Sequence, residues 1–186
     1  NLKATTDASV SATPQTIPGY TYQPLFDENG MKTVASGTVA GDGSLVLNLY
    51  YTPDADALAY HANGGQGTMA ATEGVTDQVV EVAANGFERA GYAFVGWNTA
   101  ADGSGQAYAA GAGYALTAGD DALFAQWTPN DGTAYTVNHY KVNAAHTAAT
   151  LDNAENLNAT TDAVVEATAQ TIPGYTYQPL FDENGM

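Results

Sequence analysis

The sequence QTIPGYTYQPLFDENGM occupies residues 15–31 and returns unchanged at residues 170–186. Around it, residues 1–31 and 156–186 agree at 27 of 31 positions, with a constant shift of 155 residues. Identity over such a length does not arise by chance, so the chain is a window on a tandem array. The window holds one full period and 31 further residues.

The repeat and the turn residues divide the chain into three segments. We predict that residues 1–54 form a repeat without its first strand and that residues 133–186 begin the next, truncated copy. Residues 55–130 form a different domain between them. Proline-containing linkers at 52–54 and 129–132 separate the segments and limit their relative freedom.

Alternating side chains predict strands in the flanking repeat. In residues 45–51, Leu45, Leu47 and Leu49 share a face with Tyr51, as a half-buried strand requires. The turn signal at 40–43 predicts a hairpin before this strand, and residues 135–142 predict another strand. With 12 Tyr, 2 Trp and 20 Gly, we expect a mostly β protein, or a small α+β one, with thin, tyrosine-rich cores.

Charge and composition exclude several classes of partner. Four Lys and Arg against 20 Asp and Glu give a net charge of −16, so nucleic acid and anionic membrane are poor partners. No cysteine is present, which removes disulfides, thiolate metal sites and thiol nucleophiles. No apolar run approaches the ~18–20 residues that span a bilayer. Residues 1–7 do not have the layout of a signal peptide, so we expect any export signal to lie outside this sequence.

Residues 58–127 alternate short strand candidates with glycine turns, in an order that closely resembles the Listeria–Bacteroides repeat, the B-repeat type of internalin B. The resemblance implies a compact β-grasp-like fold and a bacterial surface protein. The alanine-rich stretch 109–118 departs from the family and suggests a looser edge. The structural motif residues are Asn63, Gly64, Gly65, Gly91, Tyr92, Gly96, Trp97, Gln126 and Trp127.

The flanking unit resembles the mucin-binding-protein (MucBP) repeats of Gram-positive adhesins. Three features carry this resemblance: the opening run 135–140, the Ile-Pro-Gly-Tyr motif at 17–20 and the closing run 47–51. Together, the two resemblances imply tandem β-grasp-like modules in an elongated array.

Four tyrosines form the candidate ligand patch. Tyr20 and Tyr22 alternate along a predicted strand, and Tyr175 and Tyr177 repeat them, so each pair shares a face. If that face is exposed, it can bind a glycan; packing within a half-buried sheet is the interpretation that we favour.

Other candidate sites have simpler structural explanations. Trp97 and Trp127 could stack on a sugar, but both lie in strand-like runs beside motif glycines, so we expect core packing. Acidic loops at 27–30, 102–105 and 120–121 offer oxygen ligands suited to structural calcium, although ordinary turn chemistry explains the same residues. The three histidines, His61, His139 and His146, lack metal-ligand spacing, and no nucleophile or phosphate-loop motif occurs.

One covalent link between strands also has a simpler alternative. Lys141 and Asn48 could in principle form an isopeptide bond between the first and last strands of the flanking unit. The interpretation that we favour is a lysine that protects an edge strand from aggregation. From the candidate sites as a whole, we expect no cofactor and no enzymatic activity.

These patterns predict a stalk or spacer segment of an adhesin, extracellular and anchored to a Gram-positive cell wall. Its partners would be neighbouring repeats of the same protein. The alternative function is a module that binds mucin, a host glycan or a host surface protein through exposed tyrosines. Residues 135–142 could also add to the 1–54 unit of a second molecule, which would give head-to-tail self-association.

Overall fold

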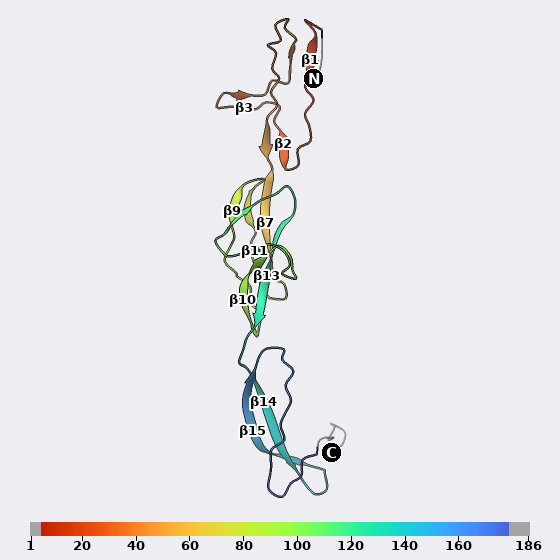
Figure 1. Cartoon of the computed structure of the whole chain (residues 1–186), viewed down its shortest axis with the longest axis vertical. Coiled ribbons are helices and arrows are strands. Elements are labelled where there is room, and N and C mark those ends of the chain that lie inside the picture. Colours follow the sequence, from red (N-terminus) through yellow and green to blue (C-terminus); the bar gives the residue numbers. More distant parts are fainter. Residues whose placement is uncertain (1–4, 179–186) are drawn as a thin grey trace. The chain divides into compact units, whose positions relative to one another are not determined.

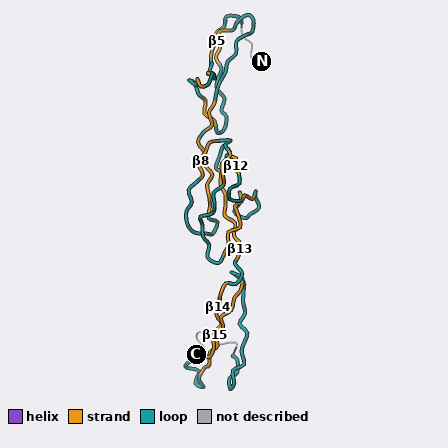
Figure 2. Tube along the Cα trace, turned by 90° about the vertical axis from the view of Figure 1, so that its left-hand side faces the viewer, coloured by secondary structure: helices purple, strands orange, loops and turns teal. Residues whose placement is uncertain are grey.

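The computed structural model describes residues 5–178, and within them the chain forms strands, turns and loops without a helix (Figure 2). Strand content is 44%, so the prediction of a mostly β protein is confirmed. This part of the chain accordingly contains no helix with the length and apolarity needed to cross a bilayer. The predicted segments 1–54 and 133–186 extend into 1–4 and 179–186, which lie outside the described residues.

The strands are short in the first part of the chain and longest in the last part, as Figure 1 shows. In chain order they are β1 (Ser9–Ser11), β2 (Tyr20–Tyr22), β3 (Asp27–Glu28), β4 (Met31–Lys32), β5 (Ser36–Thr38), β6 (Tyr51–Pro53), β7 (Ala55–His61), β8 (Thr72–Val75), β9 (Val79–Glu81), β10 (Tyr92–Asn98), β11 (Ala107–Tyr108), β12 (Gly113–Ala115), β13 (Asp121–Pro129), β14 (Thr133–Val142) and β15 (Ala149–Ala159).

The described chain divides into two compact units. Unit 1 covers residues 5–88 and 96–126, and unit 2 covers residues 89–95 and 127–178. The division crosses the middle domain that the sequence predicts at 55–130, because β10 and β13 each continue from one unit into the other.

The middle domain is built on a five-stranded sheet with the order β11-β10-β13-β7-β8. β7 and β13 are parallel, from Leu58 opposite Asp121 to His61 opposite Phe124, and β8 is antiparallel to β7. A second pair, β9 and β12, is antiparallel. Among the described residues, the largest side chains that are less than 2% exposed all belong to this domain: Trp97, Leu58, Leu116, Leu123 and Val82. Full burial of each aliphatic one contributes about 1.5–3 kcal/mol.

Residues 5–53 repeat part of this strand pairing around a less buried core. β1 pairs with β5, as β9 pairs with β12, and β2 pairs with β6, as β10 neighbours β13. β3 and β4 form a small separate hairpin. None of the large side chains in the described part of this segment reaches the burial of the middle domain's core.

In unit 2, β14 and β15 form a long antiparallel hairpin with one irregularity between His139 and Tyr140. The strand predicted at 135–142 is therefore confirmed and extends to Thr133. β14 follows a Thr-Pro-Asn linker, in the same way that β7 follows a Thr-Pro-Asp linker.

The strand predicted at 45–51 is wrong in its extent and its pairing. The turn at 40–43 forms, with Gly43 N donating to Ala40 O at 3.1 Å, but β5 pairs with β1 instead of the following segment. Only Asn48, which bridges Val34, and β6 make strand pairs. The predicted alternation survives as burial, because Leu45, Leu47 and Leu49 are half-buried while Val46 is 65% exposed.

Candidate functional site

The first copy of the tyrosine pair is engaged by neighbouring side chains. Tyr20 and Tyr22 lie half-buried in β2. Tyr20 Oη donates a hydrogen bond to Asp77 Oδ2 at 2.6 Å, which raises the pKa of the tyrosine. The ring of Tyr22 packs against Tyr51, with 5.6 Å between the centroids. In this copy, both rings serve contacts within unit 1.

The second copy has the same sequence and a different environment. Tyr175 and Tyr177 are 51% and 64% exposed, and residues 163–172 and 175–178 form no strand or turn. The Tyr175 ring lies 5.6 Å from Lys141 Nζ. The residues that pair with β2 in the first copy, Tyr51–Pro53, occur once in this sequence. Among the described residues, the second pair has no strand partner.

Asn63 and Gly64 shape a tight turn that also ties loops together. Both have positive φ, 47° and 89°, and Gly65 N donates to Ala62 O at 3.0 Å, as in a type I′ turn. Asn63 Nδ2 donates to Ala101 O at 2.7 Å and to Ala125 O at 2.8 Å. This explains why the motif needs an asparagine here, since glycine could make the turn but not the two side-chain bonds.

Trp97 occupies the centre of the middle domain. It is 1% exposed, its ring lies 4.9 Å from that of Tyr60 and 6.1 Å from that of Phe87, and Nε1 donates to Ala83 O at 3.1 Å. A residue in this position cannot present its face to a sugar. Its neighbour Gly96 has φ +150°, a conformation that glycine adopts without strain.

The other motif residues also hold structure. Gln126 Nε2 donates to Ala100 O at 3.3 Å and to Phe124 O at 3.3 Å. Trp127 is half-buried and packs edge-on against Phe94, at 5.8 Å between centroids. Tyr92 Oη donates a hydrogen bond to Asp162, and this bond raises the pKa of Tyr92. Arg89 Cζ lies 3.7 Å from the centroid of the Tyr92 ring.

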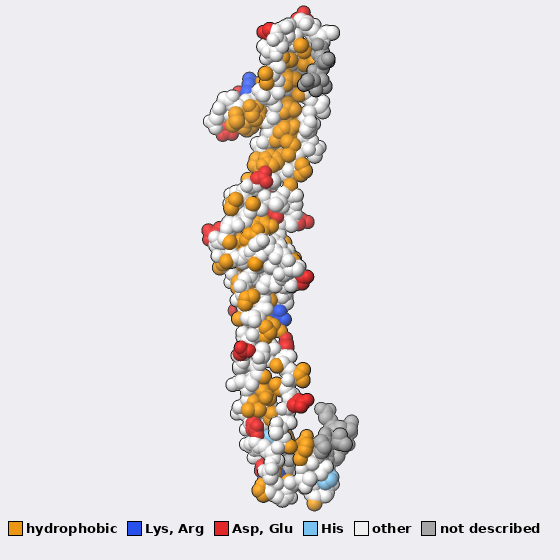
Figure 3. All heavy atoms as spheres, viewed as in Figure 1, with side chains coloured by type: hydrophobic (Ala, Val, Ile, Leu, Met, Phe, Trp, Pro, Cys, Tyr) orange, Lys and Arg blue, Asp and Glu red, His pale blue; other side chains and the backbone are white. Residues whose placement is uncertain are grey.

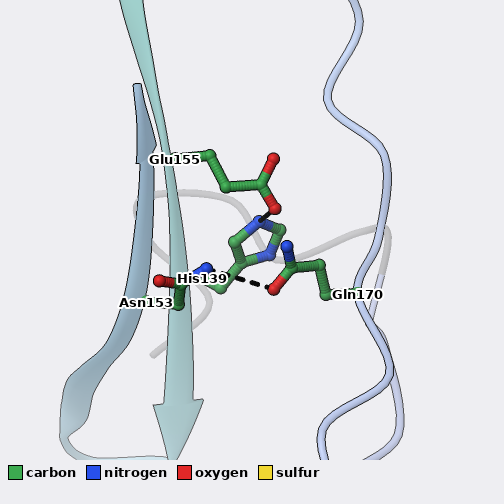
Figure 4. A network of polar contacts seen from close by, with 4 residues as sticks. All are labelled: His139, Asn153, Glu155 and Gln170. Atoms are coloured by element: carbon green, nitrogen blue, oxygen red, sulfur yellow. Dashed lines mark hydrogen bonds and ion pairs between the residues drawn. The ribbon is translucent and has the colours of Figure 1, made fainter. Parts of the chain in front are cut away.

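Each of the three histidines contacts residues that hold structure or lies in a turn. His61 stacks on Phe124 at 4.8 Å between centroids, and His146 occupies a turn with φ 54°. His139 Nε2, on β14, lies 3.2 Å from Glu155 Oε1 on β15. Figure 4 shows Gln170 approaching the same place from the segment beside the hairpin, where Asn153 Nδ2 donates to Gln170 Oε1 at 3.3 Å.

The acidic loop at 102–105 uses a carboxylate for local bonds. Asp102 Oδ1 accepts from Ser104 N at 3.0 Å and from Ser104 Oγ at 2.6 Å, and these bonds lower the pKa of Asp102. Asp27 and Glu28 lie exposed in β3. Among residues 5–178, no group of three or more His, Asp or Glu side chains could hold a metal ion.

Lys141 Nζ forms an ion pair with Asp152 across the β14–β15 hairpin, and this bond raises the pKa of Lys141. Asn48, the proposed partner in an isopeptide bond, pairs through its backbone with Val34, at 2.8 and 3.0 Å. Both arrangements are those of ordinary strand residues.

Asp121 is a buried polar residue that the sequence pattern did not identify as buried. It is 6% exposed and accepts hydrogen bonds from Tyr114 Oη at 3.0 Å, Thr117 N at 2.6 Å and Thr117 Oγ1 at 2.9 Å. Its position at the start of a strand, after the exposed Asp120, gave it the pattern of a surface loop. Tyr114 and Leu116, 9% and 0% exposed, anchor the alanine-rich stretch that the sequence suggested would be loose.

The Tyr114–Asp121 bond predicts a loss of stability at alkaline pH. Burial, followed by this bond, raises the pKa of Tyr114 to about 12, against about 10 for an unperturbed tyrosine. The folded state therefore favours the protonated phenol, and this stabilisation is complete below pH 10 and lost between about pH 10 and 12. Tyr114→Phe should flatten that part of a pH profile of the unfolding free energy. An unchanged slope would contradict the assignment.

The comparisons with known proteins support one of the two family resemblances. A family model of the Listeria-Bacteroides repeat domain matches residues 57–126, so the resemblance predicted for 58–127 is confirmed. This family is found in bacterial surface proteins and is typical of extracellular or surface proteins in bacteria. The MucBP resemblance of the flanking segments stays a prediction. Searches of curated proteins and of solved structures found no match to the chain.

Proposed function

We propose that the chain is a non-enzymatic tandem-repeat spacer of a bacterial adhesin, anchored to a cell wall of the Gram-positive type, which holds a distal binding region away from the cell. The observation that carries the proposal is the 155-residue repeat around a domain of a family found in surface proteins. Near-identical copies fit selection for length better than selection for one binding site.

The use of the aromatic side chains supports a structural role. In the middle domain, Trp97 is enclosed by Tyr60 and Phe87, and in the first flanking segment Tyr22 packs on Tyr51. Aromatic rings are the largest apolar side chains of this sequence, and thin modules need them for their own cores. In a module whose strands are all paired, little aromatic surface is then left for a ligand.

The charge of the chain supports an extended, soluble stalk. Asp and Glu side chains are scattered over the face drawn in Figure 3, where Lys and Arg are few, in line with the net charge of −16. Like charges on successive modules repel one another, and this repulsion is screened over ~8 Å at physiological salt. It favours separation of modules and opposes clumping of neighbouring stalks.

The alternative function, a module that binds mucin or a host glycan, draws support from the exposure of Tyr175 and Tyr177. A glycan array and a mucin-coated surface, probed with the 186-residue chain, separate the two functions. The spacer proposal expects no binding above that of an unrelated acidic protein. Reproducible binding that Tyr175→Ala or Tyr20→Ala abolishes would overturn it in favour of the glycan-binding module.

We also propose that a second copy of this chain can complete the flanking module. In the middle domain the strand after the linker, β7, pairs in parallel with the last strand, β13. By the same plan, β14 would pair in parallel with β6 of a second molecule, in head-to-tail complementation. Light scattering over a range of concentrations tests this: a mass that rises with concentration is expected, and a constant monomer mass would overturn it.

A further inference from the structure

Within unit 1, a turn of the first flanking segment docks on a turn of the middle domain. Tyr20 Oη donates to Asp77 Oδ2 at 2.6 Å. The linker residue Asp54 makes backbone bonds to both turns: its N donates to Gly19 O at 2.8 Å, and its O accepts from Thr76 N at 3.0 Å. The linker is thus bonded on both sides.

Within unit 2, the other end of the middle domain makes the same set of bonds to the second flanking segment. Tyr92 Oη donates to the carboxylate of Asp162. Asn130 N donates to Gly91 O at 2.8 Å, and Asn130 O accepts from Thr161 N at 2.9 Å. Here too a single linker residue joins the two turns.

The two junctions share backbone conformation as well as hydrogen bonds. The glycines have φ +73° (Gly19) and +79° (Gly91), and the aspartates have φ 64° (Asp77) and 62° (Asp162). Each linker residue follows a Thr-Pro pair, at 52–53 and 128–129. We call a Gly-Tyr turn with its Thr-Pro-Asx linker the donor half, and a Thr-Asp turn the acceptor half.

The glycines leave room for the acceptor half. A Cβ added to Gly19 would lie 2.6 Å from the Thr76 side chain, and one added to Gly91 would lie 2.9 Å from the Thr161 side chain. At Gly174, which has the same Pro-Gly-Tyr sequence and φ +81°, a Cβ would meet nothing within 4 Å. The close approach of the glycine to a threonine side chain is therefore a property of the junction and not of the turn conformation.

We propose that this donor–acceptor joint is a common coupling device that fixes successive modules of the array to one another, although the modules differ in sequence. Thr6–Asp7 repeats the acceptor turn and Gly174–Tyr175 repeats the donor turn. The partner that Gly174–Tyr175 fits is the Thr-Asp turn of a following module of the middle-domain type, and Thr6–Asp7 fits the Gly-Tyr turn of a preceding one.

The joint rests on the proposed spacer function and adds to it. A stalk keeps a fixed length only if its junctions resist bending. Proline in the linker restricts the chain, and the bonds on both sides of the linker residue remove the remaining freedom at that point. A junction of this kind acts as a stiff coupling and not as a flexible tether.

Amide hydrogen exchange measured by NMR on the whole 186-residue chain tests the joint. The N–H groups of Asp54, Thr76, Asn130 and Thr161 bond across the joints and should exchange slowly. Gly19→Ala should speed exchange at Asp54 and Thr76 by about tenfold or more and leave Asn130 and Thr161 unchanged. Gly174→Ala is the matched control, because it imposes the same backbone strain on the same local sequence outside a joint.

Tyr20→Phe removes only one hydroxyl, so this variant tests the joint even if Gly19→Ala unfolds the first segment. It should speed exchange at the same two amides, while Tyr175→Phe should not. Rapid exchange at all four amides in the unmodified chain, or equal effects of Gly19→Ala and Gly174→Ala on Asp54 and Thr76, would overturn the joint. Failure of the spacer function would appear separately, as glycan binding by a chain whose joint amides stay protected.

Discussion

Trp97→Ala is expected to lower the unfolding free energy of the middle domain by about 3–5 kcal/mol. The side chain is 1% exposed, so its removal leaves a large cavity between Tyr60 and Phe87. It also leaves Ala83 O without the bond from the indole Nε1. Because small domains are stable by about 5–15 kcal/mol, the loss would bring this thin module close to unfolding at room temperature.

Urea denaturation followed by far-ultraviolet circular dichroism measures this loss. Trp127→Ala is a useful comparison, because Trp127 is half-buried and should cost distinctly less. Trp97→Phe should recover part of the stability, since it keeps a ring in the cavity while losing the Nε1 bond. If Trp97→Ala cost no more than about 1 kcal/mol, as a surface substitution does, the assignment of Trp97 to the core would be wrong.

Asp121→Ala is the second substitution with a large expected effect, a loss of about 3–5 kcal/mol. Hydrogen bonds to a charged group contribute about 1.5–3 kcal/mol each, and a buried donor left without its partner costs about 1–3 kcal/mol. Asp121 accepts bonds from Tyr114 Oη and from two donors of Thr117. Their loss would release the segment that carries the fully buried Leu116.

The neighbouring carboxylate supplies the matched control. Asp120 is exposed, so Asp120→Ala removes the same charge from nearly the same place and should change stability by less than about 0.5 kcal/mol. Thermal unfolding of both variants at neutral pH gives the comparison. Equal effects of the two substitutions would show that Asp121 acts through net charge and not through its hydrogen bonds.

Turn formation follows from local sequence, because the information lies in adjacent residues. The Ile-Pro-Gly-Tyr turn forms in both copies, with Tyr20 N donating to Ile17 O at 3.1 Å and Tyr175 N to Ile172 O at 3.0 Å. Proline sets φ at the first central position and glycine supplies positive φ at the second. The turn predicted at 40–43 also forms, with Gly43 N donating to Ala40 O at 3.1 Å.

Strand formation in the repeat could not be predicted locally. Residues 20–22 form β2 because β6 pairs with them, whereas the identical residues 175–177 form no strand. A strand exists through its partner's hydrogen bonds, so the same segment has two structures in one chain. The strand predicted at 45–51 failed for the same reason, since the candidate partner β5 pairs with β1.

The candidate site was predicted unevenly. Core packing of Trp97 follows from its place in an apolar run beside a motif glycine, and the structure buries it. The Tyr20–Asp77 and Tyr92–Asp162 bonds join residues 57 and 70 positions apart, and no local pattern marks such pairs. The useful signal is the recurrence of Thr-Asp, Gly-Tyr and Thr-Pro-Asx in this order in two unlike modules.

The length of multi-period chains tests the spacer most directly. Chains of one, two and three 155-residue periods would be compared by small-angle X-ray scattering at physiological salt. Stiffly coupled modules predict a maximum dimension that grows by a constant increment with each period. Increments that shrink with each added period, as the square-root growth of a flexible linker requires, would contradict the idea that this chain sets a fixed distance from the cell.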